Sequence, residues 1–175
     1  MGRLVLGVLG IALVWASQIP NAQASPTHRA SLSTSYAGFI IDEDIAPMGG
    51  VISAEYEYFF SDAFAVRLGA GGGYFLGEPD EEDHNGSYTG HAVIGATYLI
   101  DNLKYVPYGT VGIGALSFTD SRIEPGMALF VEGGGGIDVI LNRSVAVGLT
   151  FKFEAQLSRV AFFTAGARVV YRWGD

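Results

Sequence analysis

The segment VAVGLTFKFEAQL, residues 145–157, alternates apolar residues with small or polar ones along its whole length. Because side chains on a β-strand point alternately to its two faces, Leu149 and Phe151 share an apolar face, while Thr150 and Lys152 share a polar one. Strands of soluble proteins usually have roughly 5–6 residues, whereas a tilted strand needs roughly 9–11 residues to cross a bilayer. The segment therefore predicts a strand that crosses a bilayer with its apolar face toward lipid.

The same alternation recurs along the chain and predicts eight strands. Short links are expected at 61–63, 101–104 and 142–144, and longer links, richer in charged and turn residues, at 42–50, 77–86 and 119–126. Alternating short and long links are typical of transmembrane barrels. We therefore expect an all-β fold, an eight-stranded antiparallel transmembrane up-and-down β-barrel. Its strands are predicted at 30–41, 51–60, 64–76, 87–100, 105–118, 127–141, 145–157 and 160–173.

Residues 1–24 have the features of a signal peptide. Arg3 is followed by an apolar run over 4–16, and small residues directly precede Ser25, as a signal peptidase requires. The run is shorter than the roughly 20 residues of a spanning helix, and an uncleaved anchor is the alternative. We expect cleavage before Ser25, which leaves residues 25–175 as one outer-membrane β-barrel domain.

The composition narrows the class of protein further. The chain has 25 glycines, no cysteine and a formal net charge of −8 at pH 7. Glycines inside strands suit a narrow barrel, because its interior positions have little room. The negative charge argues against nucleic acid as a partner. A chain without cysteine can pass through an oxidising compartment without a disulfide framework.

Alternation alone does not say which face points outward, because a soluble lipocalin-type barrel has its apolar face inside. In this sequence the charged strand residues share a face with most of the strand glycines, which suits a narrow polar interior. Aromatic residues on the opposite face gather near the strand ends, as they do at the two interfaces of a membrane. The expected interface aromatics at the end with the short turns are Tyr58, Phe60, Phe64, Tyr98, Tyr105, Tyr171 and Trp173.

The charged strand residues are expected to form ion pairs that fill the barrel. The turn at 61–63 places Glu57 opposite Arg67, and the turn at 142–144 leaves Glu132 diagonal to Lys152. Removing one member of a buried pair leaves the other buried and uncompensated, so each charge needs a partner. We expect pairs centred on Glu57–Arg67 and on Lys152 with Glu132 or Glu154. The whole predicted interior set is Glu55, Glu57, Arg67, Glu132, Asp138, Lys152, Glu154 and Arg168.

The segment VPYGTVGIG, residues 106–114, resembles the Pro-Tyr, spaced-glycine strand of the OmpA-type and opacity-type outer-membrane β-barrel superfamily. The last predicted strand, 160–173, is similar to the alternating targeting signal of such proteins, except that Gly174 and Asp175 follow Trp173. The resemblance implies a place in the outer membrane of a Gram-negative bacterium. It also implies contact with outer-membrane lipid and lipopolysaccharide, and insertion by the barrel-assembly machinery.

That superfamily includes lipid A-modifying enzymes, so the resemblance raises the question of a catalytic site. A serine hydrolase needs a His base beside its Ser and a carboxylate that orients the His. Val93 stands two residues after His91, where the deacylases carry a Ser, and His91 is expected to point inward. The acidic loop at 80–86 fails as a calcium loop, because Ala92 stands where an EF-hand needs a Glu. We expect no enzyme activity, no metal site and no cofactor.

Three hypotheses for the function follow. The leading one is a structural or surface-interaction protein of the outer membrane, with its interior plugged by ion pairs and its acidic loops facing outside. The alternative is a narrow porin for small solutes, although an eight-stranded barrel is only wide enough for its own side chains. A lipid A-modifying enzyme comes third. The sequence names no surface ligand.

Overall fold

The computed structural model of the chain describes residues 27–41, 44–76, 87–100, 104–119, 127–156 and 160–174. The predicted signal peptide, residues 1–24, lies outside the described residues, as does the predicted loop 77–86 and most of the predicted loop 119–126. Within the described part of the chain, no helix is long and apolar enough to cross a membrane.

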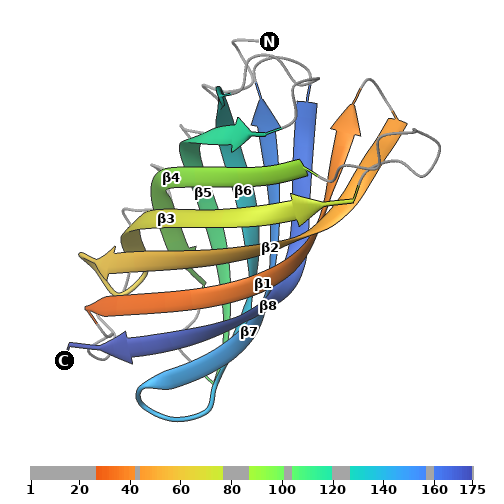
Figure 1. Cartoon of the computed structure of the whole chain (residues 1–175). Coiled ribbons are helices and arrows are strands. Elements are labelled where there is room, and N and C mark those ends of the chain that lie inside the picture. The colour runs from red at the N-terminus through yellow and green to blue at the C-terminus, as the bar shows by residue number, and fades with distance from the viewer. Residues whose placement is uncertain are drawn as a thin grey trace.

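Eight antiparallel strands form a closed barrel (Figure 1). Each strand pairs with the next one along the chain, and the last pairs with the first, so the sheet has no free edge. The prediction of an eight-stranded antiparallel up-and-down β-barrel is confirmed. The strands are β1 (His28–Ile41), β2 (Asp44–Phe59), β3 (Phe64–Phe75), β4 (Ser87–Leu99), β5 (Tyr105–Phe118), β6 (Met127–Ile140), β7 (Val145–Gln156) and β8 (Val160–Trp173).

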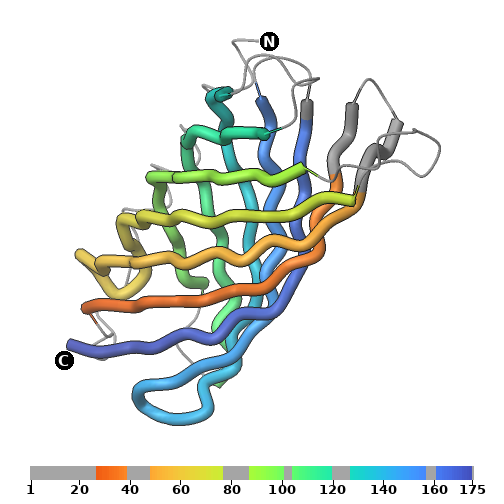
Figure 2. The backbone as a smooth tube through the Cα atoms, in the orientation of Figure 1, coloured from red at the N-terminus to blue at the C-terminus, as the bar shows by residue number. Residues whose placement is uncertain are grey.

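The short turns set the register that the sequence predicted. Across β2 and β3, Glu57 pairs with Arg67, and across β6 and β7, Asp138 pairs with Gly148. The backbone N–H of Arg172 donates to the carbonyl of Ser144 at 2.8 Å, so the end of β8 lies beside the turn between β6 and β7. Figure 2 shows the C-terminus at the same end of the barrel as this turn. We call this end the turn end.

The predicted loop at 42–50 is wrong in its bounds, because β2 begins at Asp44 and pairs with β1 as far as Ile41. The residues Pro47, Gly49 and Gly50 favour a turn, and this led to the expectation of a loop. The structure places a register shift between Gly38 and Phe39, which leaves Pro47 without a pairing partner. A β-bulge accommodates Pro47, since proline lacks the N–H that a paired position would donate.

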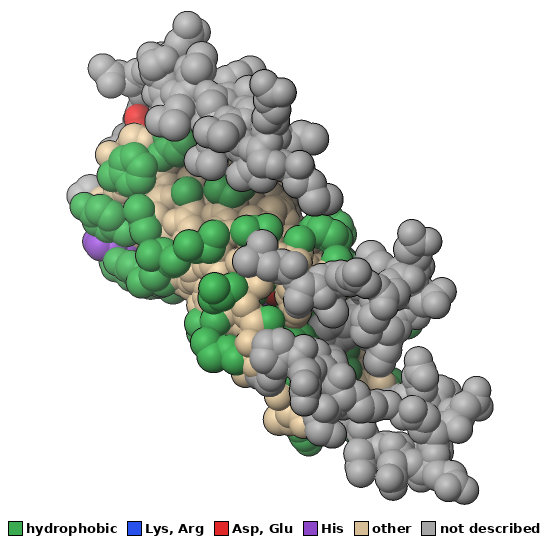
Figure 3. Space-filling view, turned by 90° about the horizontal axis from the view of Figure 1, so that it is seen from above, with side chains coloured by type: hydrophobic (Ala, Val, Ile, Leu, Met, Phe, Trp, Pro, Cys, Tyr) green, Lys and Arg blue, Asp and Glu red, His purple; other side chains and the backbone are tan. Residues whose placement is uncertain are grey.

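The two faces of the barrel wall differ in the way the alternation predicted. Large apolar side chains are exposed on the outside of the strands, and Figure 3 shows hydrophobic side chains over much of the described surface in view. Leu149 on β7 is 63% exposed, whereas its neighbour Thr150 is 6% exposed and points into the barrel. The apolar face therefore lies outside, which excludes the lipocalin-type arrangement.

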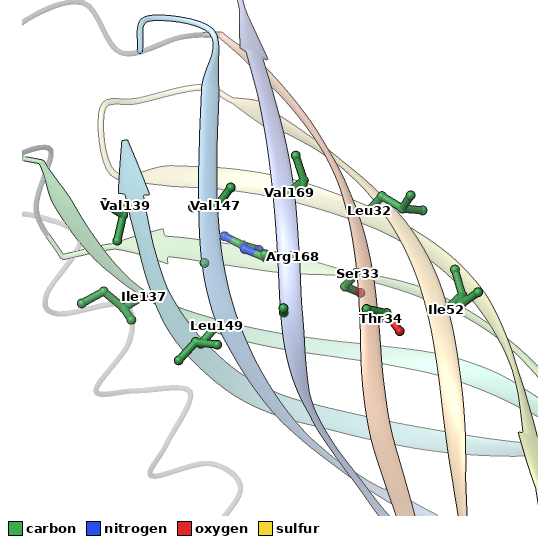
Figure 4. A pocket seen from close by; sticks show the side chains of 12 residues that line it. Leu32, Ser33, Thr34, Ile52, Ile137, Val139, Val147, Leu149, Arg168 and Val169 are labelled. Carbon is green, nitrogen blue, oxygen red and sulfur yellow. The ribbon is translucent and has the colours of Figure 1, made fainter. Parts of the chain in front are cut away.

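An apolar hollow of about 620 Å³ lies on this outer face (Figure 4). It forms where the small residues Thr34 and Ala167 pair across β1 and β8, while larger apolar side chains such as Ile52 and Leu149 stand around them. The hollow shows that the outer wall is apolar even where its surface dips between side chains.

We predict that Leu149→Arg destabilises the barrel in phospholipid vesicles by about 2–4 kcal/mol, because it places a charge on the outer face near the middle of β7. Val145→Arg lies on the same face at the turn end of the strand and should cost about 0–1 kcal/mol, because the new charge reaches the membrane interface. Urea unfolding in vesicles measures both values. Equal costs at the two positions would show that this face does not meet lipid.

Candidate functional site: the barrel interior

The inward-pointing side chains are arranged in layers along the barrel axis. Along β2 they read Val51, Ser53, Glu55, Glu57 and Phe59 from the loop end to the turn end. The same order of apolar, polar and apolar residues runs along β6, whose inward positions begin with Ala128 and Phe130 and end with Ile140. The interior is therefore a charged middle layer between two apolar layers.

The two apolar layers are clusters of buried side chains. The turn-end cluster contains Phe59, Ala65, Leu99, Val106 and Tyr108, with Ile140 packed against it. The loop-end cluster contains Ala37, Val51, Phe75, Val93, Leu116, Phe118, Phe130 and Phe162. The sequence predicted a polar interior throughout, and the two apolar clusters correct that prediction. The sequence does contain a signal for apolar layers, because several strands have a phenylalanine at an inward position near one end.

The middle layer is a network of buried ion pairs that joins opposite sides of the barrel. Four acids and four bases take part among the described residues. The contacts are Arg29 with Glu57 and Asp138, Arg67 with Glu55 and Glu132, Lys152 with Glu55 and Glu132, and Arg168 with Asp138 and Glu55. Each of these residues is at least nine-tenths buried. Glu57 contacts one opposite charge, and each of the other seven residues contacts two or three, so these attractions offset much of the free-energy cost of removing the charges from water.

Glycines on the neighbouring strands make room for Arg67, which is completely buried. Arg67 pairs in register with Gly95 on β4, Gly95 pairs with Gly112 on β5, and Gly112 pairs with Glu132 on β6. The guanidinium of Arg67 crosses both glycines and donates to the Glu132 carboxylate. A Cβ atom on Gly112 would lie 3.2 Å from Nη2 of Arg67. These four paired residues on β3 to β6 therefore leave space for the long side chain of Arg67, because Gly95 and Gly112 have no side chains.

Arg168 on β8 crosses a glycine in the same way. It pairs in register with Gly148 on β7, which pairs with Asp138 on β6. Arg168 donates two hydrogen bonds to the Asp138 carboxylate, at 2.8 Å from Nε and 2.5 Å from Nη2. Paired bonds of this kind are among the stronger hydrogen bonds in proteins and also fix the orientation of both side chains. Figure 4 shows the side chain of Arg168 extending from β8 toward β7.

The predicted pair of Glu57 with Arg67 needs correction. The two residues are opposite in register, but no ion pair within 4.0 Å joins them. Arg67 extends the other way, over the glycines of β4 and β5, while Glu57 contacts Arg29 at 3.3 Å and accepts a hydrogen bond from Thr97 at 2.6 Å. Arg67 binds Glu132 and not Glu57 because Gly95 on β4 and Gly112 on β5 lack side chains and leave space in that direction.

Arg29 is the member of the network that the sequence analysis missed. It lies one residue before the predicted start of the first strand, so its face was not assigned. The structure begins β1 at His28 and points Arg29 inward, where it contacts Glu57 and Asp138. The signal was the inward alternation that continues through Ser31 and Ser33.

Two arginines connect the charged layer with the turn-end cluster. The guanidinium of Arg168 lies 3.8 Å from the ring centroid of Tyr108, and that of Arg29 lies 5.5 Å from the ring centroid of Phe59. A cation over an aromatic ring is stabilised by the negatively polarised face of the ring, more strongly where water is excluded. The charged layer is therefore in direct contact with the turn-end cluster.

Glu154 has a different place from the one predicted. It pairs in register with Glu132 and is 2% exposed, yet it makes no ion pair with Lys152 or with any other described residue. Its Oε2 atom has no hydrogen-bond partner. Lys152 contacts Glu55 and, at 3.9 Å, Glu132 instead.

The predicted interface aromatics lie on the outer face near the turn end, where they contact one another. Phe64 lies 4.7 Å from Tyr98 between ring centroids, and Tyr171 lies 5.5 Å from Trp173. The other predicted residues of this group, Tyr58, Phe60 and Tyr105, are exposed on the same face. His28, which was not predicted, stacks on Trp173 at 5.6 Å and joins Tyr58 to this group.

The structure brings one Ser and one His together inside the barrel. Ser53 Oγ lies 3.4 Å from Nε2 of His91, at the edge of a polar cavity of about 10 Å³. A cavity of this size holds about one water molecule, so no lipid substrate reaches the pair there. His91 points inward as predicted and cannot serve a lipid-facing active site from this position. Among the described residues, no group of three or more acidic or histidine side chains is placed to hold a metal ion.

No protein-family model matches the sequence, and no curated protein matches it by sequence. Solved structures share the fold. The chain is similar to Neisserial surface protein A, with a TM-score of 0.65 and 11% identity over 86% of this chain and 100% of that one. It is similar to Ail, the attachment invasion locus protein of Yersinia pestis, with a TM-score of 0.57 and 16% identity over 86% and 100%.

A third similar structure is the outer membrane enzyme PagL, with a TM-score of 0.54 and 12% identity over 79% of this chain and 97% of that one. The chain therefore has the fold of the small eight-stranded outer-membrane β-barrels, the class to which its sequence was likened. The fold includes both an attachment protein and an enzyme, so the fold by itself does not decide the function.

We predict that Gly134→Ala lowers the free energy of unfolding by about 1–3 kcal/mol, because the added methyl group overpacks the interior. A Cβ there would lie 2.5 Å from the carbonyl oxygen of Phe151 and 3.0 Å from Cγ of Lys152. The adjacent Gly133 points outward with nothing within 4 Å, so Gly133→Ala should raise stability by up to about 1 kcal/mol. Urea unfolding in detergent compares them. A similar loss at both positions would mean that crowding is not the cause.

We predict that Arg67→Gln and Glu132→Gln each destabilise the barrel by about 3–5 kcal/mol, because each leaves a buried charge without its partner. The double variant should recover part of the sum, which a double-mutant cycle measures as a coupling energy. The matched cycle of Arg67→Gln with Glu57→Gln should give a smaller coupling, since those two side chains do not make an ion pair. Equal couplings would contradict the crossing of Arg67 toward β6.

Proposed function

We propose that this protein is a closed structural barrel of the outer membrane that holds its longer, acidic loops at the cell surface for interaction with surface ligands. The observation that carries the proposal is the layered interior. Two apolar clusters and a charged network occupy three successive layers in the described part of the barrel, and we propose that these layers close the lumen to water. A closed barrel cannot act by transport, so its function depends on its surfaces.

The location in the outer membrane is supported by the outer face as well as by the fold. Exposed apolar side chains cover all eight strands, with aromatic residues near the turn end. Such a face is stable in contact with lipid and would aggregate in water. We propose that residues 1–24 direct export and are then removed, and that the barrel-assembly machinery inserts the remaining chain into the membrane.

The surface role is supported by where the sequence carries its acidic residues. The segment 77–86 contains Glu78, Asp80, Glu81, Glu82 and Asp83, and the link between β5 and β6 adds Asp120 and Glu124. Both segments connect strands at the end opposite the short turns. The similar protein Ail is named for attachment and invasion and has been solved with a heparin analogue. We propose a surface role of this general kind, together with contact with lipopolysaccharide around the barrel.

The absence of enzyme activity is part of the same proposal. PagL shares the fold and is an enzyme, so the fold leaves this possibility open. In this chain, the Ser53 and His91 side chains face a cavity of about 10 Å³ inside the barrel and not the lipid. Measurement of lipid A and phospholipid turnover by the refolded protein tests this part, and product formation above the protein-free control would contradict it.

We predict that the refolded protein gives no sustained ion conductance in planar bilayers, because the layers of the lumen block the passage of hydrated ions. Leu149→Ala changes only the outer face and should be equally silent, which controls for damage by substitution as such. Stable openings of the unmodified protein would favour the narrow porin over the closed barrel.

A further inference from the structure

The buried charges of the interior do not balance. Among the described residues, the charged side chains that are at least nine-tenths buried are the acids Glu55, Glu57, Glu132, Asp138 and Glu154, and the bases Arg29, Arg67, Lys152 and Arg168. Five acids face four bases, and the four bases are all bound to the other four acids. Glu154 is the surplus acid.

Apart from these four bases, the described chain places no Lys or Arg near Glu154, and His91, which lines the same cavity, is counted here as neutral. The register partner of Glu154 on β8 is Phe162, whereas Arg172 lies ten residues further along that strand, roughly 33 Å away. On its other side, Glu154 pairs with Glu132, which carries the same charge. An ionised carboxylate in this position requires a nearby positive charge, because isolation from water disfavours it strongly.

A polar cavity lies directly beside Glu154. Hydroxyl groups and the Glu154 carboxylate line most of it, and the full lining is Ser33, Ser35, Ser53, His91, Thr150, Lys152, Glu154 and Thr164. Glu154 lines the cavity, and its Oε2 atom has no hydrogen-bond partner. The cavity volume of about 10 Å³ corresponds to about one sphere of the size of a water molecule.

We propose that this cavity binds one small monovalent cation of the Na⁺ class. Hard cations take oxygen ligands, and both carboxylate and hydroxyl oxygens accept contacts of this kind. One bound monovalent cation makes the set of five buried acids and four buried bases neutral. A cation of this class without its water shell fits a cavity of about 10 Å³, whereas the larger organic cation choline does not. Lys152 also lines the cavity, but its charge is already shared between Glu55 and Glu132. The proposed site lies beyond the function proposed above, because it concerns the interior and not the surface.

The experiment compares the full chain refolded into zwitterionic micelles in NaCl with the same chain refolded in choline chloride at equal ionic strength. Refolding in each salt is required because the apolar clusters on both sides hinder exchange with the closed barrel. Thermal unfolding is followed by circular dichroism. The midpoint should be higher in NaCl and should rise with the logarithm of the Na⁺ concentration, since a ligand of the folded state stabilises it in that way.

Variants then locate the effect. Glu154→Gln removes the surplus charge and should unfold at the same temperature in both salts. Thr164→Val removes one lining hydroxyl and should raise the Na⁺ concentration needed for half of the shift by roughly two- to tenfold. Thr110→Val is the matched control, because Thr110 is also a buried, inward threonine but does not line the cavity. It should keep the full response.

Two results would overturn the proposal. Equal unfolding midpoints of the unmodified chain in the two salts would show that no Na⁺ is bound, and that a proton on Glu154 or on His91 balances the surplus negative charge instead. A response that persists in Glu154→Gln would show that Na⁺ acts elsewhere on the protein. If Glu154→Gln does not fold, the comparison of the unmodified chain with Thr164→Val and Thr110→Val decides the question. None of these outcomes depends on the conductance or on a surface ligand.

Discussion

The narrowness of the closed barrel is the constraint on which the rest of the structure depends. An eight-stranded barrel has room for its own side chains and for little more, so a long inward side chain must lie over positions that have none. Arg67 crosses Gly95 and Gly112, and Arg168 crosses Gly148. The abundance of glycine is thus the counterpart of the buried arginines and not a sign of flexibility. Each of these three glycines lies on the path of an arginine side chain from another strand.

The charged layer follows from this arrangement. With water excluded by apolar clusters above and below, every electrostatic contact inside is stronger than at a surface, and every missing contact is more costly. The network therefore connects strands that are far apart in sequence, as when Arg29 on β1 contacts Asp138 on β6. Such contacts join the two sides of the barrel across its interior. Among the described residues, Glu154 is the buried acid that makes no ion pair.

The separation of interior and surface explains why one fold serves different functions. The strands provide a filled, closed wall, and the segments between them are free to differ without disturbing it. Proteins with this fold include one named for attachment and invasion and one described as an enzyme. In the present chain the only Ser–His contact among the described residues is enclosed, and the acidic residues gather in the longer links. Both facts support the proposed role of the protein at the cell surface.

The sequence by itself determined the number of strands, the face of the residues in the predicted strands and the register of the hairpins at 61–63 and 142–144. These properties depend on a period of two and on turn length, both of which are local, so Glu57 was placed opposite Arg67 correctly. Only the tertiary structure decided the partners. Arg67 binds Glu132, 65 residues away, and Pro47 sits in a bulge where the sequence suggested a loop. The physical reason is that closing the sheet brings together strands that no local pattern links. The direction of a long side chain then depends on which neighbours leave space for it.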